Sequence, residues 1–258
     1  MNAYILIKMA PDPVEELDIA NDGKSLNSEF IRFKAGDPDE HSIEQALLLK
    51  EKNGGKVTVV ALDAPEVDDV LYTALAEGVD RAVKISLDQT QLGSVATAQA
   101  FASFFQKEGI SSDTLIMPGT QAIDDIEGET GALLAEMLGL PYIGVVSGVT
   151  LTNDGAKAVV LKEFSSGLRG EYEVELPAVL GIQSAEKPPR YVPVAKVRAV
   201  MKTAKIETVD LSEPEKAKIL EIERMYKPEV AGRAQILEGD VKEIAAKLAA
   251  IFAERGII

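Results

Sequence analysis

The stretch GTQAIDDIEGETG, from Gly119 to Gly131, gathers several side chains that could do chemistry. Asp124, Asp125, Glu127 and Glu129 place four carboxylates within six residues. Carboxylates this close together could bind Mg²⁺ or Ca²⁺, act as a general acid and base, or accept hydrogen bonds from a ligand. The spacing lacks the alternating acidic pattern of a calcium loop, so we expect no metal here. The chain supplies no evident nucleophile or electrophile to accompany acid–base chemistry, so we expect no catalytic residue either.

The last residues of this loop, Glu129, Thr130 and Gly131, open an apparent helix, and an apolar run precedes the loop. A helix that begins soon after a strand offers free backbone amides, which can receive a ligand phosphate where a small residue permits close approach. The carboxylates would then accept hydrogen bonds from ribose or adenine. A simpler interpretation is that acidic residues gather here because the helix dipole stabilises them. The place of the loop between a strand and a helix favours the phosphate-binding interpretation.

The elements around the loop alternate between apolar runs and amphipathic stretches. Near-continuous apolar runs, typical of strands buried on both faces, occupy residues 3–9, 56–62, 81–85 and 114–119. Apolar residues at helical spacing lie between these runs. This alternation predicts an α/β fold with a doubly wound, mostly parallel sheet of Rossmann-like, nucleotide-binding type. In such sheets ligands bind beyond the carboxyl ends of the strands.

The pattern changes after Tyr142. Residues 142–183 contain β-rich runs separated by NDG and SSGLRG, which predicts an added β-hairpin region, and the run PAVLGI predicts one more buried strand. A segment rich in lysine and arginine follows, at residues 187–205. We assign residues 1–205 to a nucleotide-binding α/β domain.

The remaining residues, 206–258, are predicted to form a C-terminal docking arm and helix. Residues 206–233 show little periodicity apart from a short polar helix near residues 213–225. The final helix is amphipathic, and Asp240 with Glu243 three residues later predicts a capping box at its start. An arm that ends in an amphipathic helix is typical of a chain that docks on a partner.

The composition excludes several classes of function. With 27 basic and 42 acidic residues the formal net charge is −15, which opposes attraction to a phosphate backbone, so we expect no nucleic-acid partner. The absence of cysteine excludes disulfides, iron–sulfur ligation and thiolate zinc sites within this chain. No apolar run approaches the ~20 residues of a transmembrane segment, and proline interrupts the N-terminus too early for a signal peptide. We expect a soluble, cytoplasmic protein.

Several segments, taken in order, resemble the β subunit of the electron transfer flavoproteins. QAIDD followed by TG is similar to the nucleotide loop of that family, and ILIKMAPDP to its opening strand and turn. GDPDEHSIEQALLLKE, LYTALAEGVDRAVKI, LPAVLGI followed by PRY, and GRAQILEGDVKEIAAKL also resemble family segments. Each segment alone is weak, but together they are specific, and the resemblance covers nearly the whole chain.

The resemblance implies an adenine nucleotide in a cleft of this chain. The residues that it assigns to the nucleotide are Leu6, Gly36, Asp37, Pro38, Asp39, Leu62, Ser94, Thr97, Gln121, Ala122, Asp124, Asp125, Glu129, Thr130 and Gly131.

Two classes of the family bear on which nucleotide this is. Ordinary members hold AMP in this subunit, and electron-bifurcating members hold a second FAD in the same cleft. GSVATAQA is similar to a bifurcating pattern and places hydroxyls at Ser94 and Thr97, which favours FAD. The loop ending Glu129-Thr130-Gly131 is similar to the ordinary class and favours AMP. Capping of a helix is an alternative role for Ser94 and Thr97.

The resemblance also implies the function. It predicts an electron carrier subunit rather than a stand-alone enzyme, forming a heterodimer with an α subunit. The pair would relay electrons through flavin from dehydrogenases, such as acyl-CoA dehydrogenases, to a downstream acceptor such as a membrane-associated, quinone-linked one, and flavin-based bifurcation is an open option. Glu186 stands where many members carry a leucine that docks into dehydrogenases. The alternative is a stand-alone, non-redox adenine-nucleotide-binding or signalling protein.

Overall fold

The computed structural model describes residues 1–27, 29–125, 127–214, 222–228, 234 and 236–258. In this part of the chain the strands are β1 (Asn2–Ile7), β2 (Met9–Pro11), β3 (Phe33–Ala35), β4 (Lys56–Asp63), β5 (Arg81–Asp88), β6 (Thr114–Pro118), β7 (Tyr142–Leu151), β8 (Lys157–Glu163), β9 (Arg169–Glu175), β10 (Ala178–Ile182) and β11 (Glu207–Val209). The helices are α1 (Asp37–Asn53), α2 (Val67–Glu77), α3 (Ser94–Glu108), α4 (Thr130–Leu138), α5 (Val194–Thr203) and α6 (Val241–Glu254). The chain divides into two compact units, Met1–Glu223 and Arg224–Ile258.

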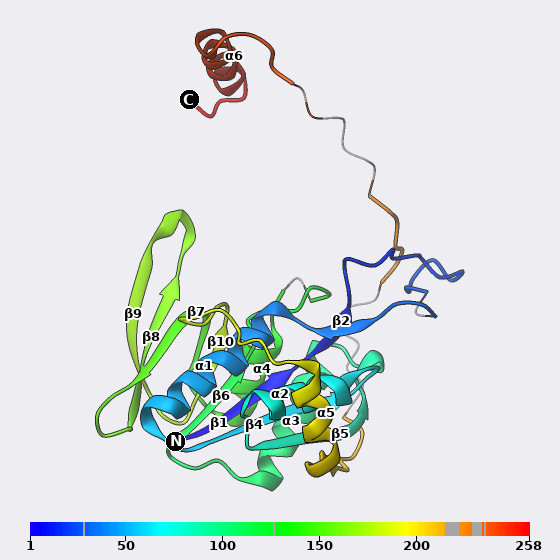
Figure 1. The fold of residues 1–258 in the computed structure, drawn as a ribbon, viewed down its shortest axis with the longest axis vertical. Coiled ribbons are helices and arrows are strands. Elements are labelled where there is room, and N and C mark those ends of the chain that lie inside the picture. Colours follow the sequence, from blue (N-terminus) through cyan, green and yellow to red (C-terminus); the bar gives the residue numbers. More distant parts are fainter. Residues whose placement is uncertain (28, 126, 215–221, 229–233, 235) are drawn as a thin grey trace. The chain divides into compact units, whose positions relative to one another are not determined.

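The first unit is built on one large sheet whose described strands follow the order β11-β5-β4-β1-β6-β10-β7-β8-β9 (Figure 1). The strands from β11 to β7 pair in parallel, whereas β8 and β9 extend the sheet as an antiparallel hairpin. The chain runs outward from β1 through β4 to β5, and then returns to place β6 on the other side of β1. The connections therefore diverge between β1 and β6, which is where parallel α/β sheets bind ligands.

Helices cover both faces of this sheet, which confirms the predicted doubly wound α/β fold. Along β1, Ile5 and Ile7 pack in one hydrophobic cluster with residues of α1 and α2, and Leu6 packs in a second cluster with residues of α3 and α4. Successive side chains of a strand point to opposite faces, so a strand covered on both faces must be apolar throughout. This requirement explains why the buried strands appear in the sequence as nearly continuous apolar runs.

The first strand is shorter than predicted. The apolar run 3–9 is divided at Lys8 into β1 and β2, and β2 pairs with β3 in a separate antiparallel ribbon. The backbone N–H of Lys8 donates to the side chain of Asp39 instead of to a neighbouring strand. The division therefore depends on a residue far away in the sequence.

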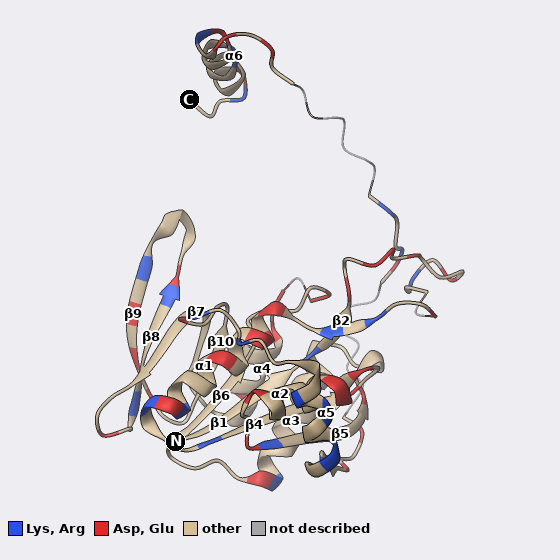
Figure 2. Cartoon of the chain, in the orientation of Figure 1, with Lys and Arg blue, Asp and Glu red and all other residues tan. Residues whose placement is uncertain are grey.

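The basic segment contains a helix that the sequence pattern did not predict. Helix α5 has no buried residue and carries several lysine and arginine side chains (Figure 2). Val194, Val197 and Val200 recur every three residues, so the periodicity of a helix is present among the basic residues of this segment. It packs beside α2.

The second unit ends in α6, and its predicted N-terminus is confirmed. The Asp240 side chain accepts hydrogen bonds from the N–H groups of Lys242 and Glu243, and the Glu243 side chain accepts one from the N–H of Asp240. The short polar helix predicted near residues 213–225 falls largely outside the described residues. Among the helices that the structure describes, none combines the length and apolar character needed to cross a membrane.

Candidate functional site

Asp39 joins the carboxyl ends of β1 and β6. It is the third residue of α1, and its side chain is 6 % exposed. Its Oδ2 accepts a hydrogen bond from the backbone N–H of Lys8 at 3.0 Å, and its Oδ1 accepts one from Gly119 at 3.1 Å. Lys8 follows β1 and Gly119 follows β6, so one carboxyl holds together the two strand ends at which the connections diverge.

A narrow cleft opens at this place, and we call it the central cleft. Its volume is about 30 Å³. Eight of the residues predicted to contact the nucleotide line it, namely Leu6, Asp39, Thr97, Gln121, Ala122, Asp125, Thr130 and Gly131. They come from the ends of β1 and β6, the first turns of α1, α3 and α4, and the loop before α4. The fold thus brings together residues that are distant in sequence.

The acidic loop is shaped by its own carboxylates. Asp125 is 8 % exposed, and its Oδ1 accepts a hydrogen bond from the backbone N–H of Gly128 at 3.2 Å. Gly128 has a φ of +62°, and a Cβ there would lie 2.6 Å from the carbonyl oxygen of Thr120, so glycine is required for the loop to fold back. Asp124 does not line the central cleft, and its Oδ1 pairs with Lys8 Nζ at 2.8 Å. In the described portion of the chain no three histidine or acidic side chains converge as a metal ion requires.

Burial controls the charge of the central cleft. It raises the pKa of Asp39 to about 7, against the hydrogen bonds from Lys8 and Gly119, which lower the pKa. The carboxyl therefore carries only part of a negative charge near neutral pH. Together with the free backbone amides at the start of α4, a weakly charged Asp39 allows a phosphate to lie close to it.

Two larger cavities flank the central cleft. The first, about 390 Å³, is lined by Gly36, Asp37 and Pro38 at the start of α1 and by Gln121 and Ala122. We call it the α1 cavity.

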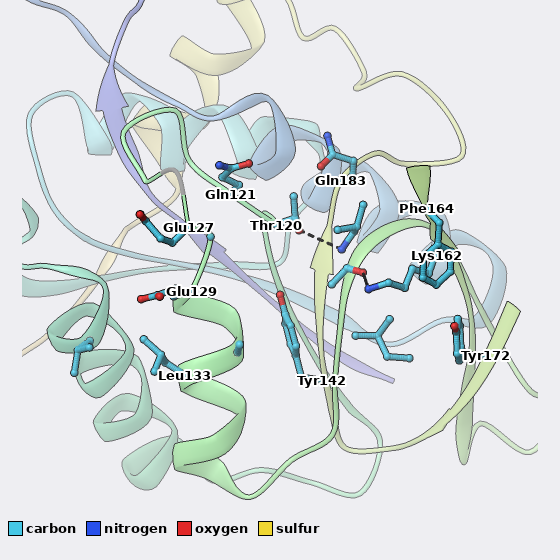
Figure 3. A pocket seen from close by; sticks show the side chains of 16 residues that line it. Thr120, Gln121, Glu127, Glu129, Leu133, Tyr142, Lys162, Phe164, Tyr172 and Gln183 are labelled. Atoms are coloured by element: carbon cyan, nitrogen blue, oxygen red, sulfur yellow. Dashed lines mark hydrogen bonds between the residues drawn. The ribbon is translucent and has the colours of Figure 1, made fainter. Parts of the chain in front are cut away.

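The second, which we call the α4 cavity, is about 980 Å³ and lies between the first turn of α4 and the strands β7, β8 and β9 (Figure 3). Glu129 lines it, together with Thr120, Gln121 and Gly128. Gln121 borders all three spaces.

Three of the predicted contact residues line none of these spaces. Leu62 is fully buried in β4, where it packs against the cluster formed by α3 and α4. Ser94 is the first residue of α3 and is only partly buried, one turn before Thr97. The Asp124 carboxylate accepts a hydrogen bond from Lys8 Nζ. None of these three side chains borders the central cleft.

Sequence reasoning missed several residues that line these spaces. Thr120 is the second residue after β6, and its Oγ1 accepts a hydrogen bond from the N–H of Val145. Its position just after a buried strand could have indicated that it faces a ligand site. Lys8 was hidden inside an apolar run that appeared to be one strand. Tyr142 and Lys162 belong to the hairpin region, and nothing in its alternating pattern indicates that it approaches the cleft.

A second feature of the first unit is the loop after β10, which is held against α1. The backbone N–H of Ala185 donates to His41 Nδ1 at 3.1 Å, and that of Glu186 donates to Gln45 Oε1 at 3.2 Å. Arg190 binds Glu44 through its backbone N–H and two guanidinium nitrogens. One face of α1 therefore fixes residues 185–190, which include Glu186, the residue that the resemblance matches with a leucine in many family members.

The chain is similar to known proteins over almost its whole length. The family profile described as "Electron transfer flavoprotein domain" matches residues 31–214. The "Electron transfer flavoprotein subunit beta" of Methylophilus methylotrophus is 29 % identical over 98 % of both chains, and that of Clostridium acetobutylicum is 30 % identical over 95 % of both. The "Acryloyl-CoA reductase electron transfer subunit gamma" of Anaerotignum propionicum is 30 % identical over 74 % of this chain and 71 % of its own.

Proposed function

The chain belongs to the electron transfer flavoprotein family as a β subunit, and from this premise we propose which nucleotide it holds and which partners it meets. Its function is electron transfer. A bound flavin would supply the redox chemistry, and the protein supplies binding and orientation. The matches give no support to the alternative of a stand-alone nucleotide-binding or signalling protein.

We propose that the central cleft and the adjoining α1 cavity together hold the adenylyl half of FAD, because the cleft alone, at about 30 Å³, is too small for it. The backbone amides of Thr130 and Gly131, in the first turn of α4, would donate hydrogen bonds to a phosphate. The Asp125 carboxylate would accept a hydrogen bond from the ribose or adenine, and the Gln121 amide could accept or donate one. The start of α1, with Gly36 and the residues after it, would enclose the other side of the nucleotide.

The observation that favours FAD over AMP is the continuity of the central cleft with the α4 cavity. Thr120, Gln121 and Gly128 line both spaces, so a ligand that fills the cleft can extend past them. The α4 cavity, at about 980 Å³, lies at the upper end of the roughly 300–1,000 Å³ typical of small-molecule sites. AMP ends at its phosphate and would leave this space unused, whereas the flavin half of FAD would occupy it.

The nucleotides released from the purified complex test this proposal. We expect co-expression with the α subunit to yield a 1:1 complex that releases two FAD molecules per heterodimer on denaturation, measured by chromatography of the supernatant. One FAD together with one AMP, in protein prepared with excess FAD, would show instead that this chain holds AMP.

A pair of substitutions in α3 tests the contacts of the cleft. Thr97 lines the central cleft and is 3 % exposed, whereas Ser94 on the preceding turn does not line it. We expect Thr97→Val, which keeps the shape of the side chain, to weaken FAD binding about 5- to 10-fold, the value of one hydrogen bond. Ser94→Ala should leave the affinity unchanged. Isothermal titration of FAD into nucleotide-free complex measures both affinities. Equal affinities in the wild type, Thr97→Val and Ser94→Ala would show that the Thr97 hydroxyl does not contact FAD.

We propose that the partners are an α subunit and one or more dehydrogenases. The amphipathic helix α6 exposes Val241, Leu248 and Phe252 and suits a partner that covers them, which we assign to the α subunit. The loop that α1 fixes presents Glu186 where family members often have leucine, and α5 follows with its lysine and arginine side chains (Figure 2). We infer that the dehydrogenase partner offers an acidic or polar surface here rather than an apolar pocket.

A further inference from the structure

Tyr142 carries a hydroxyl group without a hydrogen-bond partner at the wall of the α4 cavity. It is the first residue of β7, and in Figure 3 it stands between α4 and Lys162 with its oxygen toward Thr120. No hydrogen bond to this hydroxyl is present among the residues that the structure describes. The Tyr142 side chain is partly buried and lines the α4 cavity, so its hydroxyl is available to a molecule bound there.

Three glycines leave the space that the tyrosine ring fills. They come from three segments: Gly131 from α4, Gly144 from β7 and Gly181 from β10. A Cβ on Gly131 would lie 3.1 Å from Tyr142 Cε2, and a Cβ on Gly144 or Gly181 would lie 2.7 or 2.8 Å from the hydroxyl oxygen. Any side chain at these positions would displace the ring. The three backbones thus form a cradle that fits this one phenol.

The charged groups of the cavity do not favour an anionic ligand. Lys162 Nζ donates to the carbonyl oxygen of Gly144 at 2.9 Å and lies 5.6 Å from the centre of the Phe164 ring. Glu127 and Glu129 make one rim of the cavity acidic, which disfavours a further phosphate there. Much of the remaining wall is apolar, formed by residues such as Leu133 and Val145. The α4 cavity therefore suits a flat, uncharged and partly polar group.

We propose that the Tyr142 hydroxyl binds the ribityl–isoalloxazine half of a flavin dinucleotide whose adenylyl half lies in the central cleft. This inference rests on the FAD assignment made above. The first turn of α4 connects the two compartments, because Thr130 and Gly131 line the cleft and Glu129 lines the cavity. A pyrophosphate at this helix start would join the two halves of the ligand. Burial raises the pKa of Tyr142, so the phenol stays protonated and can donate its hydrogen bond.

Tyr142→Phe tests the role of the hydroxyl while the ring keeps its place on the three glycines. In αβ complex freed of nucleotide, we expect the Kd for FAD to rise about 5- to 10-fold, as for one lost hydrogen bond. The Kd for AMP, which does not reach the cavity, should stay unchanged, and this also reports that the variant is folded. A shift in the visible absorption of the bound flavin should accompany the loss. Tyr72→Phe, on α2 away from the site, is the matched control.

The possible results separate the two proposals. Equal FAD affinity and an unchanged flavin spectrum in Tyr142→Phe would overturn the role of Tyr142, even in a complex that holds two flavins. An equal loss of FAD and AMP affinity would also overturn it, because the substitution would then act on the central cleft. Wild-type complex that releases AMP and takes up no second FAD would overturn the FAD assignment itself, and the inference on Tyr142 with it.

Discussion

Replacing Gly119 by alanine should weaken nucleotide binding in the central cleft. The added Cβ would overlap Asp39 Oδ1 and would lie 3.0 Å from Pro38 Cβ, so the start of α1 and the end of β6 must separate. Separation breaks the hydrogen bond from the Gly119 N–H to Asp39. Because both residues line the central cleft, their separation changes its shape, and we expect nucleotide affinity to fall roughly 10- to 100-fold, or about 1.4–2.7 kcal/mol. Isothermal titration of the αβ complex with AMP and with FAD measures the loss.

A second glycine provides the control for this substitution. Gly148 lies in β7, and a Cβ there would meet only Leu161 and Glu186 at 3.6 Å and beyond, which is ordinary contact. Gly148→Ala should therefore keep wild-type affinity. Overpacking at Gly119 should also lower the free energy of unfolding by about 1–3 kcal/mol, which denaturant titration reports. Wild-type affinity in Gly119→Ala would mean that the Asp39 junction does not set the shape of the cleft.

Among the ion pairs that the structure describes, loss of Arg190 through replacement by methionine should lower the stability most. Arg190 donates to both carboxylate oxygens of Glu44, at 2.7 and 3.0 Å, and a third bond reaches Glu51. The Glu44 side chain is only 5 % exposed, so without Arg190 a buried carboxylate loses its cation. We expect about 3 kcal/mol of destabilisation, or roughly 6–12 °C in melting temperature for a unit of this size.

Two further variants show whether the buried charge causes this loss. Arg169 pairs with Glu163 on the surface, with side chains 62 % and 36 % exposed, so Arg169→Met should change the melting temperature little. Adding Glu44→Met to Arg190→Met removes the unpaired carboxylate and should recover most of the stability. If the double variant is no more stable than Arg190→Met alone, the loss comes from the loop and not from the charge. Either outcome also shows how firmly α1 holds residues 185–190.

Local patterns predicted most of the secondary structure because burial acts on neighbouring residues in a regular way. The run at residues 56–62 is almost wholly apolar because both faces of β4 are covered, and the capping box at Asp240 needs only residues three apart. Prediction failed where the local pattern was mixed or interrupted. Helix α5 has apolar residues at helical spacing, at Val194, Val197 and Val200, but they lie in a segment rich in lysine and arginine. Lys8 is flanked by apolar residues, and its backbone turns toward an aspartate instead of a neighbouring strand.

For the site, the sequence by itself determined which segments line the central cleft, because the carboxyl ends of parallel strands and the helix starts after them are set by element order. Only the tertiary structure decided which atoms meet. The hydrogen bond between Asp39 and Gly119 joins residues 80 positions apart, and its existence depends on the register of β1 against β6. The three glycines around Tyr142 come from α4, β7 and β10. Contacts of this kind follow from how distant elements pack, and no local spacing of residue types encodes that packing.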